Sequence, residues 1–460
     1  MSNKENINRE LFEKQPVRKA FITLAVPTVL SQVIIIVYSL ADSFFVGRLG
    51  DPNQVAALAI SFPVFNMLTA LANVFGIGAA SVISRSLGSH NGERAAKASS
   101  CAFWGAVLSS GLMVLILVCF MKDILFLLGA GEDTYTYTRE YLIWVVLFGG
   151  LPAELSLLLG HLLRSEGRTK SASLGMTLGG VLNIVLDPLF IFCFHLGVSG
   201  AGMATMLANT ASMLFLFFIF TRIRFHTALS LDPRKFTLGE GILLSIVSVG
   251  LPSGLNTFLV NLDNALMSGL TSAYSNQAIA AYGITQKITT ATIHISQGMA
   301  QGILPLIGYN YSQGSLSRVR ETNRFALRTL FIFTIAFFAA IELSAPALAR
   351  VFIDQASTAR VTAVFMRCWM LCSFGMCLFQ MYNAIFQAVG LWKQALLLTV
   401  CRLGIFFPAA ALGADALFSL RGLMFSQPLS DTLTLLLCML AYRRMNSRLL
   451  SDTGPAKLRQ

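Results

Sequence analysis

Twelve apolar segments divide this sequence, and each is long enough to cross a lipid bilayer. A membrane-spanning helix needs roughly 20 predominantly apolar residues. Runs of about that length occupy residues 21–46, 56–83, 101–121, 138–161, 172–194, 201–221, 243–270, 279–306, 325–345, 361–386, 395–414 and 422–442. The loops between them are short, and the longest, residues 221–241, falls at the middle of the chain. The pattern predicts an all-α integral membrane protein with twelve transmembrane helices.

The two halves of the chain resemble each other at a shift of 222 to 225 residues. LAVP at 24–27 parallels VGLP at 249–252, and RSEGRTKSA at 164–172 parallels QAVGLWKQA at 387–395. An even number of spans separates the copies, so both have the same orientation, as in parallel transporter repeats. We therefore expect two like-oriented six-helix lobes, with a cavity and alternating access between them. The expected division is a cytosolic N-terminal segment (1–20), an N-lobe (21–221), a cytosolic connector (222–241), a C-lobe (242–442) and a cytosolic tail (443–460).

The charges follow the membrane pattern rather than a nucleic-acid pattern. Only 12% of the residues are charged, although the net charge is +12. Of the 34 Lys and Arg, 25 lie in segments on the side of the N-terminus and six on the other side. Cytosolic loops are the ones rich in Lys and Arg, and the polar N-terminus has no apolar core typical of a secretory signal. We expect a bacterial cytoplasmic (inner) membrane protein with both termini in the cytosol and no nucleic-acid partner.

The sequence offers no metal site and no disulfide framework. The eight Cys lie in or beside apolar runs, without a CxxC pair or a Cys/His cluster. There is no HExxH, no GxSxG and no nucleotide-binding loop. An enzyme and a pump driven directly by ATP are therefore both unsupported.

Four polar residues of the first half are expected at one depth in the membrane. Asn183 and Asp187 share a helix face because they are four residues apart. Asp42, Asp187 and Thr205 each lie about five residues from the outer end of their spans, or roughly 7 Å deep. Two carboxylates in an apolar pocket do not both ionise readily, so they can hold a proton; the same oxygens suit Na⁺. The alternative is that Asp187 caps or kinks its helix and Asp42 binds a backbone amide.

Other ionisable residues within spans are further candidates. Glu154 and His161 lie seven residues apart on one face, and they either form a structural pair or affect which substrate charge is preferred. Asp263 and Lys287 can pair along the cavity, or Lys287 can extend to the membrane surface. Met267 stands where the repeat would place a second Asp42, so the predicted ion site belongs to one lobe.

Several segments resemble the multidrug and toxic compound extrusion (MATE) family, and within it the DinF-like branch of bacterial exporters. They are PTVLSQVIIIVYSLADSFFVGRLG (27–50), LLRSEGRTKSA (162–172), LNIVLDPLFIFCFHLGVSGAGMAT (182–205) and, in the second half, LPSGLNTFLVNLDNALM (251–267). The resemblance covers nearly the whole chain. It implies a secondary transporter that exports bulky, often cationic, aromatic or amphipathic compounds, driven by inward H⁺ or Na⁺. It also implies a monomer that needs no cofactor beyond the coupling ion.

The resemblance assigns roles to particular residues. The family's acidic pair corresponds to Asp42 and Asp187. Its partner side chains correspond to Asn183, Thr205 and Tyr38, and a proline at which the first helix is proposed to bend corresponds to Pro27. The resemblance gives no general role to Glu154, Asp263 or Lys287, which we treat as candidate cavity residues. A flippase for a lipid-linked precursor, in the same broad superfamily, is the alternative function; it would favour several basic residues in the cavity.

Overall fold

A computed structural model describes residues 10–353, 355–371 and 373–450, the last three without side chains, and all regular structure in this part of the chain is helical. Side-chain caps fix two of the tight turns: Asp51 accepts from the Asn53 amide, and Asn91 from the Arg94 amide, both at 2.9 Å. The first half contains η1 (Glu10–Lys14), α2 (Val17–Gly47), α3 (Pro52–Gly88), α4 (Gly92–Leu127), α5 (Glu132–Leu142), η2 (Ile143–Phe148), α6 (Gly150–Ser165), α7 (Thr169–Pro188), η3 (Leu189–Cys193) and α8 (Gly197–Arg222).

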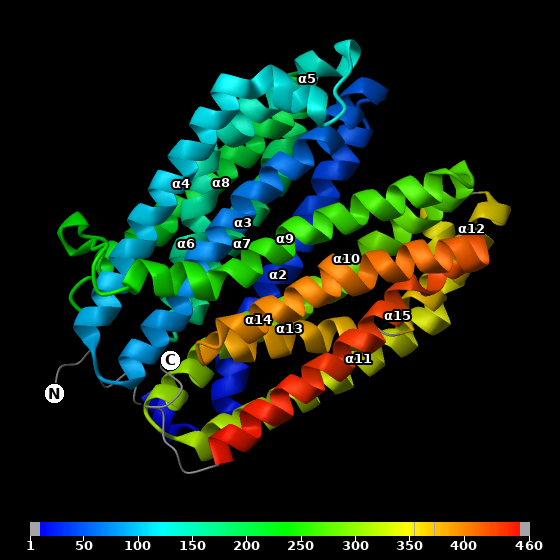
Figure 1. Cartoon of the computed structure of the whole chain (residues 1–460). Coiled ribbons are helices and arrows are strands. Elements are labelled where there is room, and N and C mark those ends of the chain that lie inside the picture. The colour runs from blue at the N-terminus through cyan, green and yellow to red at the C-terminus, as the bar shows by residue number, and fades with distance from the viewer. Residues whose placement is uncertain (1–9, 354, 372, 451–460) are drawn as a thin grey trace.

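The second half follows a short linking segment and has the same succession of long helices (Figure 1). The cap of Ser275 on the Ala278 amide, at 3.1 Å, starts its second long helix. The elements are η4 (Pro233–Lys235), α9 (Ile242–Ser272), α10 (Asn276–Ser312), α11 (Leu316–Phe352), α12 (Ala356–Met370), α13 (Ser373–Ala388), α14 (Trp392–Thr399), η5 (Val400–Phe406) and α15 (Phe407–Leu450).

The helices give the twelve crossings that the sequence predicts. Within the described residues, 8 helices are long and apolar enough to cross a membrane, or up to 10 when α5–α6 and α12–α13 each count as one bent crossing. A further crossing is α10, whose polar residues lower its mean hydropathy. The last apolar helix, of 56 residues, would be about 84 Å long and is not one crossing. Its backbone breaks at Ser419, and Arg402 pairs with Asp431 across the reversal, which makes two crossings.

Two lobes meet along four helices. The N-lobe holds α2–α8 and the C-lobe holds α9–α15, with α3 packed along α9 and α2 along α10 (Figure 1). We call the end that carries η1, residues 222–241 and the end of α15 the connector end, and the opposite end the far end. Toward the connector end the lobes touch backbone to backbone: a Cβ on Gly250 would lie 1.8 Å from the Val74 carbonyl oxygen, and one on Gly88 would lie 2.1 Å from that of Tyr309. Only glycine allows this approach.

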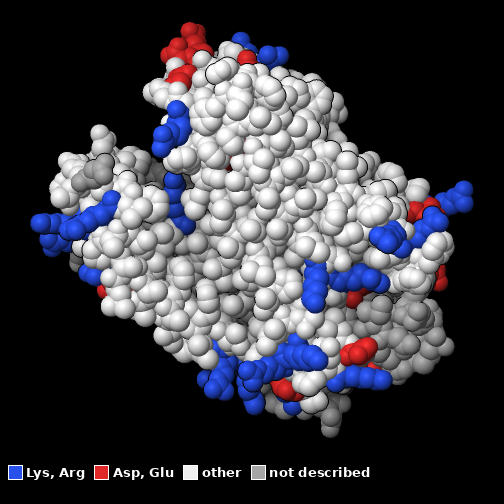
Figure 2. Space-filling model, turned by 180° about the vertical axis from the view of Figure 1, so that it is seen from behind, with Lys and Arg blue, Asp and Glu red and all other residues white. Residues whose placement is uncertain are grey.

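Charged side chains gather toward the two ends of the molecule. Figure 2 shows a broad uncharged band across the face that it presents, with Lys and Arg most abundant toward the connector end. Large apolar side chains are exposed on the outside of the helices, among them Leu108, Leu112 and Leu115 on α4, each 59% exposed or more. Such exposure is costly in water and favourable in lipid. The chain is therefore a multi-pass membrane protein, as predicted.

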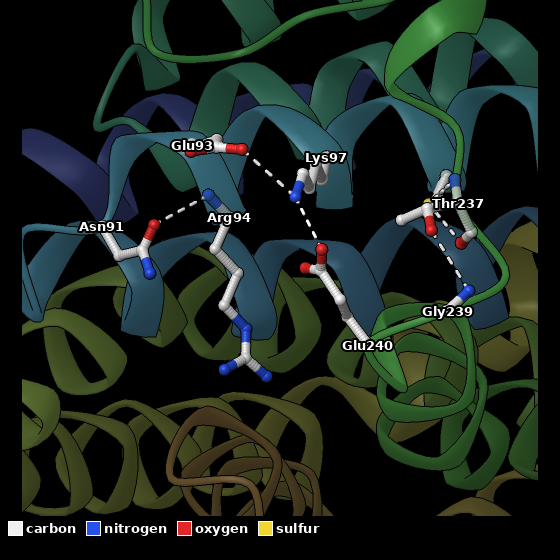
Figure 3. A network of polar contacts seen from close by, with 8 residues as sticks. Asn91, Glu93, Arg94, Lys97, Thr237, Gly239 and Glu240 are labelled. Atoms are coloured by element: carbon white, nitrogen blue, oxygen red, sulfur yellow. Dashed lines mark hydrogen bonds and ion pairs between the residues drawn. The ribbon is translucent and has the colours of Figure 1, made fainter.

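The segment between the lobes lies on the N-lobe. Lys97 of α4 contacts Glu240 at 2.7 Å and Glu93 at 3.1 Å, and Figure 3 shows these contacts beside Thr237 and Gly239. Deeper in, Trp104 donates its indole N–H to the Leu231 carbonyl at 3.1 Å. The hydrogen bonds satisfy backbone groups of a segment that has little regular structure of its own.

Candidate functional site

The core of the predicted ion site forms between α7 and α8. The Asn183 side-chain amide donates to Asp187 Oδ1 and to Thr205 Oγ1, both at 3.3 Å. Asn183 is 3% exposed and Asp187 is fully buried. The spacing of four residues places Asn183 and Asp187 one helical turn apart, and the amide then links that turn to the neighbouring helix.

Helix α2 completes the group from the other side. Asp42 and Tyr38 are one turn apart on α2, and both are close enough to Asp187 to interact with it electrostatically. The Tyr38 ring would lie 3.3 Å from a Cβ on Gly180 of α7, so the two helices are in close contact at this level. The structure therefore brings together all five residues that the sequence analysis placed at the ion site.

A sixth residue, Tyr141, was missed by the sequence analysis. It lies on α5, is 6% exposed, and its hydroxyl lies near Thr205 and within electrostatic range of both carboxylates. A depth argument could have found it, since Tyr141 lies three residues inside the predicted span 138–161. Tyr141 therefore adds a residue of the fourth crossing to the ion site.

The site has spare oxygen acceptors and no built-in counter-charge. Asp42 Oδ1, Asn183 Oδ1 and Asp187 Oδ2 are buried without a hydrogen-bond partner. Among the ion pairs of the described residues, none involves Asp42 or Asp187. Buried oxygens of this kind are costly unless something neutralises them. A proton or a small monovalent cation would supply what the three oxygens lack.

Pro27 lies inside α2, toward the connector end. Because proline has no N–H, the carbonyl of Thr23 loses its helical partner. The Thr169 hydroxyl at the start of α7 donates to this carbonyl at 3.1 Å. The predicted hinge is thus tied to the same helix that carries Asn183 and Asp187.

The lobes enclose a cavity of about 300 Å³ toward the far end and a smaller one of about 40 Å³ nearer the connector end. Neither is lined by Asp263, Lys287 or Glu154, so their part in a substrate cavity stays a prediction. Asp263 is buried with both oxygens unpartnered, whereas Lys287 is exposed. No ion pair joins Asp263 to Lys287 in the part of the chain that the structure describes.

The expected pair of Glu154 and His161 is wrong. Glu154 Oε1 accepts from Ser109 of α4 at 2.9 Å, while Glu154 Oε2 and His161 Nε2 have no partner. A spacing of seven residues puts the two side chains about 10.5 Å apart along the helix, too far for a hydrogen bond. His161 packs instead against Gly76, where a Cβ would lie 2.5 Å from its ring.

The second lobe has a different buried charge arrangement. Arg402 Nη2 and Asp431 Oδ1 are 3.0 Å apart, and Gln427 donates to Asp431 Oδ2 at 2.8 Å. Arg402 also lies over the ring of Phe379, 5.0 Å from its centroid. Each charge has its partner, so loss of one member of this group would leave the other charge buried and unpaired between the last two crossings. The Met267 side chain is fully buried at the repeat position of Asp42.

Comparison with known proteins gives the family. The model of the MatE family matches residues 27–189 and 252–412, and the two matches begin 225 residues apart (252 minus 27), within the shift expected for the repeat. The multidrug export protein MepA of Staphylococcus aureus (strain N315) is 28% identical over 448 residues, covering 96% of this chain and 97% of MepA. MepA of Staphylococcus saprophyticus is 27% identical over 442 residues, with the same coverage.

Solved structures share the fold. An outward-facing conformation of a multidrug resistance MATE family transporter of the MOP superfamily has a TM-score of 0.91 at 24% identity, covering 98% of this chain and 100% of that one. A MOP superfamily transporter from Pyrococcus furiosus has a TM-score of 0.90 with the same identity and coverage. The two family matches span most of the chain, and the chain therefore belongs to the MATE family of transporters and is not an enzyme.

Proposed function

We propose that the chain is a secondary active exporter that moves bulky organic compounds, often cationic and aromatic, out of the cell against inward H⁺ or Na⁺. The observation that carries the proposal is the buried group of Asp42, Asp187, Asn183 and Thr205, whose oxygens lack a counter-charge. The family and the multidrug export proteins similar to this chain support the substrate class.

The proposed location is the bacterial cytoplasmic membrane, with the connector end and both termini in the cytosol. The excess of Lys and Arg toward the connector end supports this orientation (Figure 2). The far end then faces outward, and the backbone contacts at Gly250 and Gly88 close the cytosolic side. With this orientation, the structure corresponds to an outward-facing state, and we propose that the protein is a monomer.

The proposed cycle begins with entry of the ion. In the outward-facing state, H⁺ or Na⁺ reaches Asp42 and Asp187 from outside and neutralises the carboxylates. Loss of their charge changes the packing of α2, α7 and α8, with α2 bending at Pro27, and substrate is released outward. After the lobes reverse, the ion leaves to the cytosol and cationic substrate is favoured again. The membrane potential supplies about 2.3 kcal/mol per charge per 100 mV.

A flippase for a lipid-linked precursor is less well supported. A lipid phosphate favours Arg or Lys at its binding site. Within the described residues, neither interlobe cavity is lined by Lys or Arg. Uncharged cavity walls suit a cationic or neutral compound better than an anionic head group.

Everted vesicles carrying a preformed pH gradient test the proposal. We expect ethidium to dissipate the gradient in Na⁺-free buffer, or ethidium to move once a Na⁺ gradient is imposed. Asp42→Asn and Asp187→Asn should abolish either response, whereas Asp123→Asn, which alters an exposed carboxylate, should leave it intact. Coupled export that survives both substitutions at the site would refute the proposed coupling.

A further inference from the structure

A polar but uncharged face runs along α10, where it lies between the lobes. Gln286, Thr290, His294, Gln297 and Gln301 are three or four residues apart, so they share one side of the helix. An exposed side chain in lipid would be apolar. A stripe that is polar over four turns therefore faces the interior of the protein and not the lipid. We call it the carboxamide face, because three of its five members are glutamines.

The smaller cavity between the lobes is built at the inner part of this face. Seven carboxamide side chains, from α3, α9, α10 and α13, line it, and no charged residue does. Three of these side chains have a buried carbonyl oxygen without a hydrogen-bond partner: Asn256, Gln301 and Asn383. Asn256 and Asn383 are 7% and 5% exposed. Unpartnered buried acceptors are costly, so their concentration at one cavity points to a donor that binds there.

The carboxamide face has members at both this inner cavity and the larger outer one. Gln286 lines the outer cavity, and Gln297 and Gln301 line the inner one. Between these levels His294 contacts Gln32 of the N-lobe at 2.9 Å. The carboxamide face thus reaches both cavities, with a polar contact between the lobes partway along it.

The repeat shows that the fold does not require these amides. At the 225-residue shift of the family matches, Asn256 corresponds to Ser31. At the 223-residue shift that relates Gly390 to Gly167, Asn383 corresponds to Gly160. The same frame in the N-lobe therefore has no carboxamide at either place. Asn256 and Asn383 are therefore a property of the C-lobe, as the acidic group is of the N-lobe.

We propose that the inner cavity binds a hydrogen-bond-donating group of the transported compound, an amine, amidine or hydroxyl, through the oxygens of Asn256, Gln301 and Asn383. The cavity volume of about 40 Å³ is about three times what one water molecule needs, which fits such a group and not a whole drug. The inference rests on the proposed export function. It assigns recognition of donor groups to the C-lobe and ion binding to the N-lobe, so that among compounds of equal charge the hydrogen-bond donors decide which bind well.

Two cationic aromatic probes separate donor recognition from charge recognition. Ethidium carries two aromatic amines, whereas tetraphenylphosphonium has the same charge and no hydrogen-bond donor. Equilibrium binding of each to the purified full chain is measured by fluorescence or radiolabel, without any ion gradient. Asn256→Leu and, separately, Gln301→Leu remove one acceptor each; Asn276→Leu is the control, because it alters an exposed carboxamide at the far end.

We expect ethidium to bind at least about tenfold more weakly to the Asn256 and Gln301 variants, and tetraphenylphosphonium to bind them within twofold of the unaltered chain. Equal weakening of both probes, or weakening of neither, would overturn the donor site. Ion-coupled export of ethidium could then still hold, because gradient-driven transport is measured separately. An unaltered chain that binds neither probe would contradict the donor site and the proposed substrate class together.

Discussion

The close contact between α3 and α9 gives the sharpest quantitative prediction. In Gly250→Ala, the new Cβ would lie 1.8 Å from the Val74 carbonyl oxygen and 2.6 Å from its carbon. Carbon and oxygen need a separation of at least about 3.0 Å, so the helices must move apart locally by roughly 1.2 Å. Overpacking of this kind costs about 1–3 kcal/mol, which shifts a two-state equilibrium about 5- to 150-fold.

The contact exists only while the lobes are closed at the connector end, so Gly250→Ala should favour the state that is open there. Spin labels at Arg94→Cys and Ser317→Cys, with the exposed native cysteines replaced by serine, report the separation of the lobes at that end. We expect a larger population at long distance in Gly250→Ala. The matched control is Gly269→Ala on the same helix, where nothing lies within 4 Å of the added carbon.

An unchanged distance distribution in Gly250→Ala would refute the reasoning, because it would mean that the backbone contact does not limit closure. A shift of equal size in Gly269→Ala would refute it as well. That result would attribute the change to the higher helix propensity of alanine, about 1 kcal/mol, and not to the contact between the lobes.

Two further predictions concern polar groups that hold crossings together. Arg402→Leu leaves Asp431 buried without its partner, and we expect it to cost about 3–5 kcal/mol; a thermal unfolding midpoint that does not fall would contradict this. Thr169→Val removes the donor to the Thr23 carbonyl that Pro27 leaves free, at a cost of about 1–3 kcal/mol. Hydrogen exchange in the first half of α2 should become faster, and unchanged protection there would mean that water replaces the threonine.

The crossings were predictable from hydropathy because the bilayer sets a minimum apolar length. Even α10, the most polar of the long interlobe helices, was predicted as span 279–306, since its polar residues there include one Lys and no Asp, Glu or Arg. The reversal near Ser419 was also predicted, from the gap between spans 395–414 and 422–442. The helices extend past the apolar runs, as in α4, which begins at Gly92 and not at residue 101. Hydropathy marks the lipid-facing part of a helix and not its ends.

The N-lobe site was predictable in part because helices that cross one membrane share a depth scale. Asp42, Asp187 and Thr205 were placed together by counting residues from the outer ends of their spans, and the structure brings them together. The depth of a residue in the membrane does not show which helices are neighbours in the membrane plane. Tyr141 was missed because the sequence of one helix does not show which helix packs against it, here α8 against α5. The ion pair between Arg402 and Asp431 was not predicted for the same reason.

Competition between substrate and ion at equilibrium tests whether Asp42 and Asp187 couple ion binding to export. The dissociation constant of ethidium from the purified chain is measured across pH and Na⁺ concentration, for the unaltered chain and for Asp187→Asn. We expect H⁺ or Na⁺ to weaken ethidium binding to the unaltered chain, because linkage is reciprocal, and we expect Asp187→Asn to remove this dependence. Ethidium binding that is insensitive to both ions, or equally sensitive in Asp187→Asn, would contradict the assignment of ion coupling to this site.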